Sequence, residues 1–194
     1  MEKRITLDDT VMVTDPSYEI PTWCQIKLTD VLPGSYLPMC LDIDTGGWGR
    51  RECVLLAVHE DYVDSKLAWR KTLGEVGVDS GQAGIFSYDS YRNDEIASNI
   101  KVPELAYDGR PFEYPWRDKA GDAWYEQICR ITLGELSWGA YEEGVASRSG
   151  YGDGSYTCYV AKKNKKIVAI AIDFNVIRIS SGLLNEIKDD LKFN

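Results

Sequence analysis

Two β-rich runs near the C-terminus, joined by a lysine-rich turn, constrain the fold of this chain more than any other feature. The runs are Ser155–Ala161 and Ile167–Phe174, and the turn is centred on Asn164, a residue type that tolerates the positive φ angles of a tight hairpin. Every residue from 167 to 172 is apolar, which is typical of a strand buried on both faces. The pattern predicts a hairpin whose second strand lies centrally in a sheet.

The N-terminal half of the chain also alternates between β-rich runs and turns. The turns contain proline, glycine, aspartate or serine, which fix φ or accept positive values of it, so each turn can end a strand. The runs that we expect to form strands are Arg4–Val13, Trp23–Val31, Tyr36–Ile43, Arg51–His59 and Val76–Asp79.

Two segments have the apolar spacing of amphipathic helices. The first runs from 123 to 133, with Asp122 as its expected N-cap residue. The second runs from 181 to 192, with Ser181 as its expected cap. The polar segment 87–119, which is rich in proline and tyrosine, precedes the first helix and is expected to be mostly irregular.

These elements predict an α+β fold, a mainly antiparallel twisted β-sheet or β-sandwich with two amphipathic helices packed on it. A length of 194 residues suits a single domain over residues 1–194. The sequence has no run of about eighteen apolar residues, which a membrane-spanning helix would need, and no visible secretory signal. We therefore expect a soluble, cytoplasmic protein without a membrane partner.

The acidic composition narrows the choice of partners. The chain has 31 Asp and Glu residues against 22 Lys and Arg residues, a net charge of −9. Nucleic-acid binders usually present a basic surface to the phosphates, so we expect no nucleic-acid partner. The four lysines around Asn164 are better explained as the solvated tip of the hairpin. A basic protein partner remains compatible with this charge.

The cysteine and histidine content limits metal chemistry. The five cysteines are widely spaced and form no C-x-x-C pair, which favours reduced thiols over a disulfide framework or a four-ligand zinc site. His59 is the only histidine, so a site with several histidine ligands cannot form. We therefore expect unpaired thiols, no bound metal and no cofactor.

Three turns that combine an aspartate with small residues make up the candidate site. They are Thr14–Tyr18, Val78–Gly84 and Ser149–Tyr156. Backbone amides beside glycine can approach an anion closely, and aspartates can hold a hydroxyl group or a divalent cation. We predict that the turns surround one shared pocket. The alternative is that the glycines only supply positive φ and the aspartates only bond their own backbone amides.

These turns and the segment around Trp48 supply the candidate ligand-binding residues. Tyr18, Gln82 and Tyr156 are expected to orient a polar ligand. Trp48 would form a wall of the pocket, and Arg50 would meet a phosphate group. The complete set is Asp15, Tyr18, Trp48, Arg50, Asp79, Ser80, Gln82, Tyr151, Asp153 and Tyr156. The sequence assigns no catalytic residue, so it leaves open whether the protein is an enzyme.

Four short motifs carry a family resemblance. They are Asp-Pro-x-Tyr from Asp15, Gly-Gly-Trp-Gly-Arg from Gly46, Val-Asp-Ser-Gly-Gln-x-Gly from Val78 and Ser-Gly-Tyr-Gly-Asp-Gly-x-Tyr from Ser149. With them the chain resembles, over residues 15–174, a domain family of unknown function found in phage and bacterial genomes. The last motif, together with the following hairpin and the sequence Ile-Asp-Phe at 172–174, is the most specific part. The resemblance implies a small, soluble accessory protein and brings no catalytic assignment.

Three functions remain open. The first is binding of a small polar or anionic, nucleotide-like ligand, in host defence or counter-defence, because the glycine-rich turns and the many aromatic residues suit such a ligand. The second is hydrolysis with Mg²⁺ or Mn²⁺ held by Asp15, Asp79 and Asp153, since carboxylate oxygens are the ligands these ions prefer. The third is interaction with, or inhibition of, another protein through an acidic face.

Overall fold

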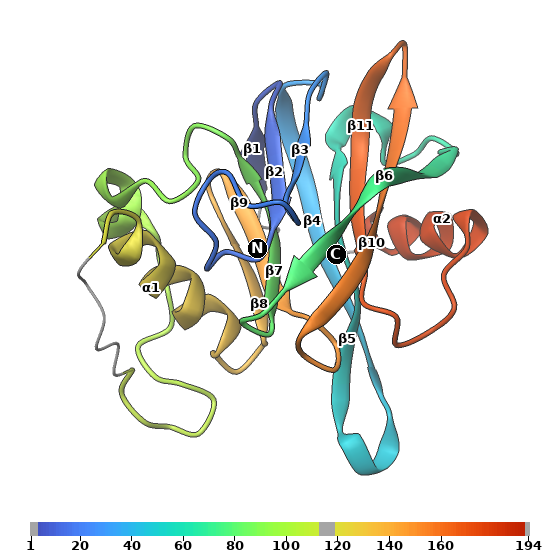
Figure 1. Cartoon of the computed structure of the whole chain (residues 1–194). Helices are drawn as coiled ribbons and strands as arrows, with labels where there is room; N and C mark the ends of the chain where they lie inside the picture. Colours follow the sequence, from blue (N-terminus) through green and yellow to red (C-terminus); the bar gives the residue numbers. More distant parts are fainter. Residues whose placement is uncertain (1–3, 113–118, 193–194) are drawn as a thin grey trace.

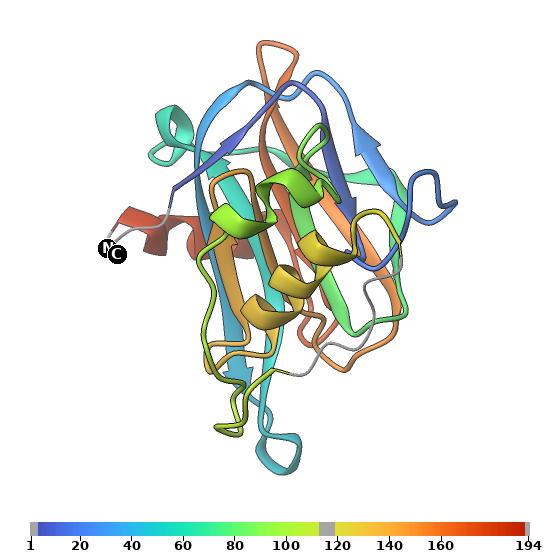
Figure 2. The ribbon, with the colours of Figure 1, turned by 90° about the vertical axis from the view of Figure 1, so that its left-hand side faces the viewer.

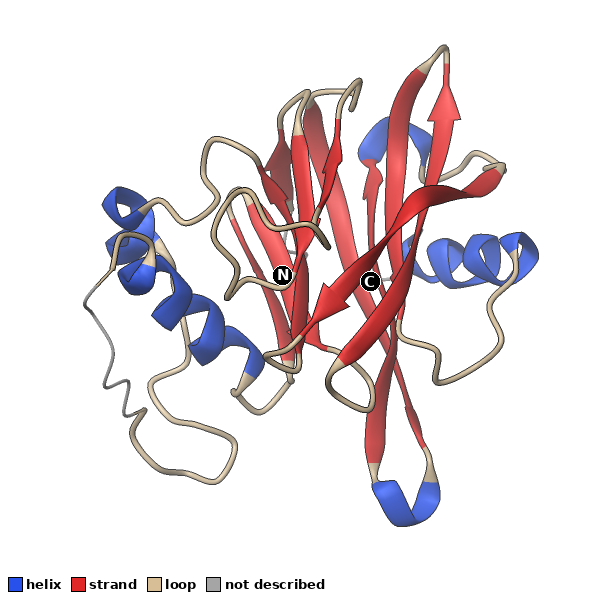
Figure 3. Cartoon of the chain, in the orientation of Figure 1, coloured by secondary structure: helices blue, strands red, loops and turns tan. Residues whose placement is uncertain are grey.

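The computed structural model describes residues 4–112 and 119–192, and it places two antiparallel β-sheets face to face between two helices (Figures 1 and 3). The six-stranded large sheet contains, in spatial order, β1 (Ile5–Leu7), β4 (Gly34–Asp44), β5 (Arg50–His59), β11 (Lys166–Asp173), β10 (Gly154–Lys163) and β6 (Trp69–Val78). The five-stranded small sheet contains β3 (Ile26–Leu28), β2 (Val11–Thr14), β7 (Gln82–Ser87), β9 (Gly144–Arg148) and β8 (Trp138–Tyr141). This arrangement confirms the predicted α+β class in its sandwich form.

The core between the sheets forms because alternate residues of each strand face the opposite sheet. Leu55 and Ile170 of the large sheet belong to the same buried cluster as Val13, Ile85 and Val145 of the small sheet. The intervening residues point outward, and many of them are also apolar, so each sheet needs a cover on its outer face.

Helix α2 (Ser181–Asp189) covers the outer face of the large sheet. Its residues Leu184 and Ile187 are buried in one cluster with Val54 and Val168 of the sheet. The 3₁₀ helix η4 (Asp190–Lys192) continues α2, and η2 (Glu60–Tyr62) follows β5.

Helix α1 (Asp122–Thr132) and the 3₁₀ helix η3 (Asp94–Asn99) cover the small sheet, and Figure 2 shows α1 lying across its strands. The centroid of the Trp124 ring lies 5.1 Å from that of Phe86. Phe86 can lie flat on the sheet because Gly84 has no side chain. A Cβ atom at Gly84 would stand 2.1 Å from the Phe86 ring and 2.7 Å from the carbonyl oxygen of Val145.

The predicted C-terminal hairpin is confirmed. Strands β10 and β11 pair antiparallel and are joined at Asn164 and Lys165, whose φ angles are 50° and 69°. Two successive positive φ angles match the right-handed twist of the flanking strands. Strand β11 lies between β5 and β10, which makes it internal to the large sheet as its apolar sequence predicts.

Several predicted strand boundaries are wrong. The run Arg4–Val13 is divided between β1 and β2, which belong to different sheets, because residues 8–10 turn the chain from one sheet to the other. In the run Trp23–Val31, only Ile26–Leu28 forms a strand. Strand β6 begins at Trp69, seven residues before the predicted run, because an edge strand with exposed charged residues lacks the apolar pattern. Gln82–Gly84 is strand rather than turn.

Both predicted helix caps are also wrong. Gly121 precedes α1, and the carboxylate of Asp94 in η3 accepts hydrogen bonds from the backbone nitrogens of Gly121 (2.8 Å) and Trp124 (2.9 Å). The cap of α1 is therefore supplied from a distant segment and not by Asp122. Helix α2 is capped by Ser180, one residue before the predicted Ser181, and its hydroxyl accepts from the nitrogen of Leu183.

The segment 87–119 is mostly irregular apart from η3, and its residues 113–118 lie outside the described part of the chain. The β4–β5 hairpin is longer than its neighbours and extends beyond the rest of the sandwich in Figure 1. Its tip carries the 3₁₀ helix η1 (Gly46–Trp48). Within the described residues, no helix is long and apolar enough to cross a membrane.

Candidate functional site

The first two predicted turns are joined by the carboxylate of Asp15. Its Oδ2 accepts hydrogen bonds from the backbone nitrogens of Asp79 and Ser80, each at 2.8 Å. Its Oδ1 accepts from the backbone nitrogen of Ser17 at 2.8 Å and from the hydroxyl of Ser80 at 2.7 Å. Asp15 is fully buried, so this carboxylate holds the two turns together and has no surface to offer a ligand.

The third turn lies against the second. The backbone nitrogen of Ser149 donates to the carbonyl oxygen of Gly81 at 3.0 Å, and Gly154 pairs with Val78 across β10 and β6. The hydroxyl of Tyr156 donates to the carbonyl oxygens of Ser149 and Gly152, which closes the turn internally. The structure therefore brings the three segments together at one end of the sandwich.

Tyr18 is engaged within the turns, whereas Gln82 is only partly hydrogen-bonded. The hydroxyl of Tyr18 donates to Asp79 at 2.7 Å, and burial together with this hydrogen bond raises the pKa of Tyr18. Gln82 is buried beside Cys129 of α1, with its amide nitrogen 3.6 Å from the Cys129 sulfur, and among the described residues its amide oxygen has no hydrogen-bond partner. Three cavities of about 550 to 670 Å³ occur elsewhere, and none of these three is lined by a residue of the turns.

The metal-dependent hydrolase is not supported by this geometry. Within the described residues, no group of three or more His, Cys, Asp or Glu side chains could hold a metal ion. Asp15 already accepts hydrogen bonds on both oxygens, and Asp153 is exposed on its turn. The three aspartates therefore share an end of the molecule without forming a ligand set.

Two of the predicted residues meet as an exposed aromatic pair. The centroid of the Trp48 ring, at the tip of the β4–β5 hairpin, lies 6.4 Å from that of Tyr151 in an edge-to-face arrangement. Trp48 is 71% exposed and Tyr151 is 57% exposed. Arg50 forms an ion pair with Asp42 on the same hairpin, at 2.5 Å, and is therefore already neutralised.

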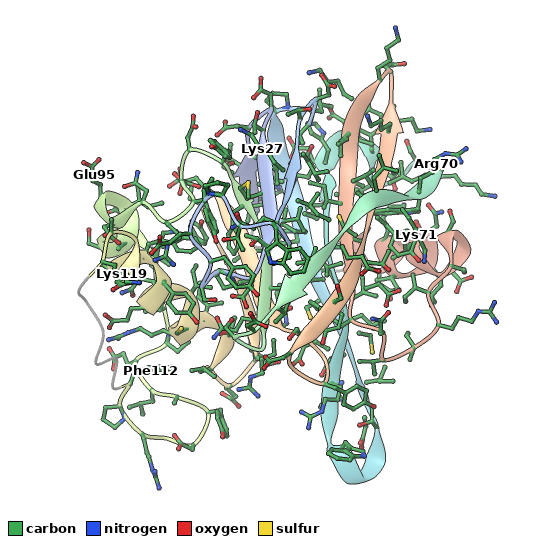
Figure 4. All side chains as sticks on the ribbon, in the orientation of Figure 1. Lys27, Arg70, Lys71, Glu95, Phe112 and Lys119 are labelled. Atoms are coloured by element: carbon green, nitrogen blue, oxygen red, sulfur yellow. The ribbon has the colours of Figure 1, made fainter. Side chains whose placement is uncertain are left out.

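A different site, on the outer face of the large sheet, has the features expected for an anionic ligand. A cavity of about 560 Å³ lies between β6, the end of β11 and the segment that leads into α2. Its polar lining includes Lys71 from β6, Asp173 from β11 and Arg178. Figure 4 shows Lys71 on the side of the large sheet that faces α2.

The sheet register positions the first wall of this cavity. Lys71 is the cross-strand partner of Tyr159 in β10, and its ammonium nitrogen lies 5.7 Å from the centre of the Tyr159 ring. Lys71 and Arg178 are exposed, and within the described residues neither has a carboxylate oxygen within ion-pair distance. The same cavity also holds the carboxylate of Asp173, on which the positive charge of Lys71 acts, so its lining combines two exposed cations with one carboxylate.

Asp173 forms the floor of the cavity. It is 7% exposed, and one of its oxygens accepts a hydrogen bond from the backbone nitrogen of Asn175 at 2.9 Å. Burial raises the pKa of Asp173, while the hydrogen bond and the positive charge of Lys71 act in the opposite direction. A carboxyl group of this kind can accept a hydrogen bond from a ligand hydroxyl and, once protonated, can donate one.

The N-terminus of α2 follows directly after the segment that lines the cavity. Ile179, the second residue before α2, lines the cavity, and Ser180 is the cap residue. The unpaired amides at a helix N-terminus carry partial positive charge and favour anions nearby. Because neither Ser180 nor a residue of α2 lines the cavity, its positive charge comes from the side chains of Lys71 and Arg178.

The residues of this cavity were not predicted as a site. Lys71 and Arg178 lie in segments that carry no motif, and their proximity depends on the strand register and on the path of the chain after β11. Asp173 could have been noticed in the sequence, because its carboxylate directly follows the apolar run 167–172. A buried charged group at the end of a central strand usually has a hydrogen-bonding or ionic partner or a functional role.

No protein-family model, curated protein or solved structure matched the chain in the comparisons.

Proposed function

We propose that this protein binds a small anionic, hydroxyl-bearing ligand of the nucleotide type in the cavity lined by Lys71, Asp173 and Arg178. The observation that carries the proposal is a cavity of about 560 Å³ whose lining contains two exposed cations, Lys71 and Arg178, together with the buried carboxyl group of Asp173. That size is within the range of small-molecule sites, which is about 300 to 1,000 Å³. The net charge of −9 makes such a local positive site more distinctive.

Each kind of residue in the lining would bind a different part of the ligand. Lys71 and Arg178 would hold a phosphate, because a guanidinium group can bond two phosphate oxygens at once and an ammonium group supplies a compact charge. Asp173 would accept a hydrogen bond from a hydroxyl group such as that of a ribose. Ile177 and Ile179 line the same cavity and offer an apolar wall to a sugar or a base. The resemblance to phage and bacterial accessory proteins suits a nucleotide signal of host defence.

Isothermal titration calorimetry with AMP, ribose 5-phosphate and adenosine tests the proposal. AMP and ribose 5-phosphate should bind, and adenosine, which lacks the phosphate, should bind at least about ten-fold more weakly. Lys71→Gln and Arg178→Gln should each weaken AMP binding by about ten-fold, because each removes one hydrogen bond between a charged side chain and the phosphate. Added salt should weaken binding further, since it screens exposed charges.

Arg70→Gln is the matched control. It removes the same charge from the neighbouring position of β6, and successive side chains of a strand point to opposite faces of the sheet. Its AMP affinity should stay within about two-fold of the wild type, because its charge lies on the other face. If AMP does not bind, or if all three variants bind it equally, the proposed function is wrong.

A further inference from the structure

We infer that the cavity at the C-terminal end of α1 is a second small-molecule site, which takes a zwitterionic ligand with an apolar side chain, the chemical class of a free apolar amino acid. The cavity measures about 670 Å³ and lies between the segment 101–109, the end of α1 and the start of β8 (Figure 1). It shares no lining residue with the cavity at Lys71, so the inference does not depend on the ligand proposed there.

The walls of this cavity are mainly apolar. Ile131 comes from the last turn of α1, Trp138 is the first residue of β8, and Leu136 lies in the connection between them. Pro103 and Leu105 come from the segment that precedes α1. Leu105 is 49% exposed and Leu136 is 70% exposed, so these walls are accessible from solvent. Apolar walls with a few polar groups are typical of small-molecule sites.

Contacts within the protein position the segment 101–109 against the end of α1. The backbone nitrogen of Tyr107 donates to the carbonyl oxygen of Leu133 at 2.9 Å. A Cβ atom at Gly134 would stand 2.9 Å from the Cγ atom of Pro103, so this close approach depends on the glycine. The cavity is therefore formed without a ligand, as most small-molecule sites are.

The charged residues of the lining are one cation and two carboxylates. Lys101, Glu104 and Glu135 line the cavity, and all three are exposed. Among the described residues, none of the three has an oppositely charged group within ion-pair distance, so they do not neutralise one another. Asp108 and Arg110 of the same loop, by contrast, form an ion pair. A ligand with both an ammonium and a carboxylate group matches this lining better than a simple cation or anion.

Arg148 contacts the cavity wall without belonging to the lining. Its guanidinium carbon lies 5.0 Å from the centre of the Tyr107 ring, and its Nε donates to the carbonyl oxygen of Thr132 at 2.9 Å. Its Nη2 atom is buried. The charges that a ligand would meet in the cavity are therefore those of the lysine and the two glutamates.

The two charges of an amino acid have separate partners in this lining. Lys101 would bind the carboxylate group, and Glu104 and Glu135 would bind the ammonium group, through charge-assisted hydrogen bonds. The indole of Trp138 would contact an aromatic or branched side chain. Loss of either charge from the ligand should therefore weaken binding.

NMR titration of the isotope-labelled protein with L-phenylalanine and two analogues tests the inference. Phenethylamine lacks the carboxylate group, and 3-phenylpropionate lacks the ammonium group. L-phenylalanine should shift amide resonances of residues 101–109 and 131–139, and each analogue should bind at least about three-fold more weakly, since it loses one exposed charge pair.

Variants should separate the two charges. Lys101→Gln should weaken the binding of L-phenylalanine by about three-fold without weakening that of phenethylamine. Glu104→Gln and Glu135→Gln should weaken the binding of L-phenylalanine to a similar extent without weakening that of 3-phenylpropionate. A lysine or glutamate that only solvates the surface would show no such dependence on the ligand.

Glu142→Gln is the matched control. Glu142 is exposed in the turn between β8 and β9 and does not line the cavity, so its affinity for L-phenylalanine should stay within about 1.5-fold of the wild type. Failure of L-phenylalanine to bind, equal affinities for the three compounds, or an equal loss in the control overturns the inference. Sedimentation velocity gives a further outcome. Dimers of the wild type that disappear in Leu136→Ala would mean that a second copy covers the cavity, which also overturns it.

Discussion

The carboxylate oxygen Oδ2 of Asp15 lies 2.8 Å from the backbone nitrogen of Asp79, a residue 64 positions later in the chain. The same oxygen also accepts from Ser80, so the end of β2 is tied to the turn that follows β6. These strands belong to different sheets. Asp15 therefore fastens the two layers of the sandwich at one end, and its role is structural.

Asp15→Asn should destabilise the fold strongly. The substitution replaces one acceptor oxygen with an amide NH₂ group, which would face backbone N–H donors in a buried site. We expect the free energy of unfolding to fall by about 2–4 kcal/mol, because hydrogen bonds to buried charges are costly to lose. Urea denaturation followed by circular dichroism measures the change.

Asp153→Asn is the matched control for that experiment. Asp153 is exposed, so its substitution should change the free energy of unfolding by less than about 0.5 kcal/mol. A stable Asp15→Asn variant, with a denaturation midpoint equal to that of the control, would contradict the structural role of Asp15.

Gly84→Ala should disrupt the contact between the small sheet and α1. The new methyl group would stand 2.1 Å from the Phe86 ring and 2.7 Å from the carbonyl oxygen of Val145, so the ring or the strand must move. We expect a loss of about 2–3 kcal/mol in stability by chemical denaturation. Gly47→Ala, at an exposed position where nothing lies within 4 Å, should be nearly neutral. Equal stability of the two variants would refute this packing.

The five cysteines should be slow to react in the native protein. All are free, and Cys24, Cys53, Cys129 and Cys158 are buried. Burial raises the pKa of Cys53 to about 11 and that of Cys158 to about 12, so few thiolates exist at pH 8. Titration with a disulfide reagent under anaerobic conditions should find five thiols in denaturant and slow reaction without it. Fewer than five in denaturant would mean that some are paired.

Asp173→Asn should stabilise the protein at neutral pH. Burial raises the pKa of Asp173 in the folded state, so its charged form is disfavoured by folding. The stability that a protonated Asp173 provides is complete below its unfolded pKa of about 3.9 and is lost as the pH rises through the folded value. The variant should melt about 1–2 °C higher at pH 7, and this gain should vanish below about pH 4. A gain that is independent of pH would contradict the assignment.

The sequence predicted those parts of the fold whose signal is local. The apolar run 167–172 identified an internal strand, and Asn164 identified the hairpin turn. The errors occur where distant segments decide the outcome. The local sequence does not show that Arg4–Val13 is divided between two sheets. It also does not show that Asp94 caps a helix that starts at Asp122.

The sequence predicted one pocket shared by the three aspartate turns; the turns are in contact, but none of the three cavities described above is lined by their residues. The three aspartate turns lie together, and Trp48 lies beside Tyr151, although more than one hundred residues separate the two rings. The alternative reading, that the aspartates bond backbone amides, describes Asp15 better, except that two of those amides belong to another turn. The cavity at Lys71 was missed because the strand register and the path after β11, rather than any motif, create it.

A crystal structure of the protein grown with AMP tests the central claim most directly. The account predicts electron density for the phosphate between Lys71 and Arg178, with a ribose hydroxyl group directed at Asp173. The density should be absent from crystals of Arg178→Gln grown in the same way. A nucleotide bound elsewhere, for example among the turns at Asp15, Asp79 and Asp153, or an empty cavity under conditions where calorimetry detects binding, would contradict the account.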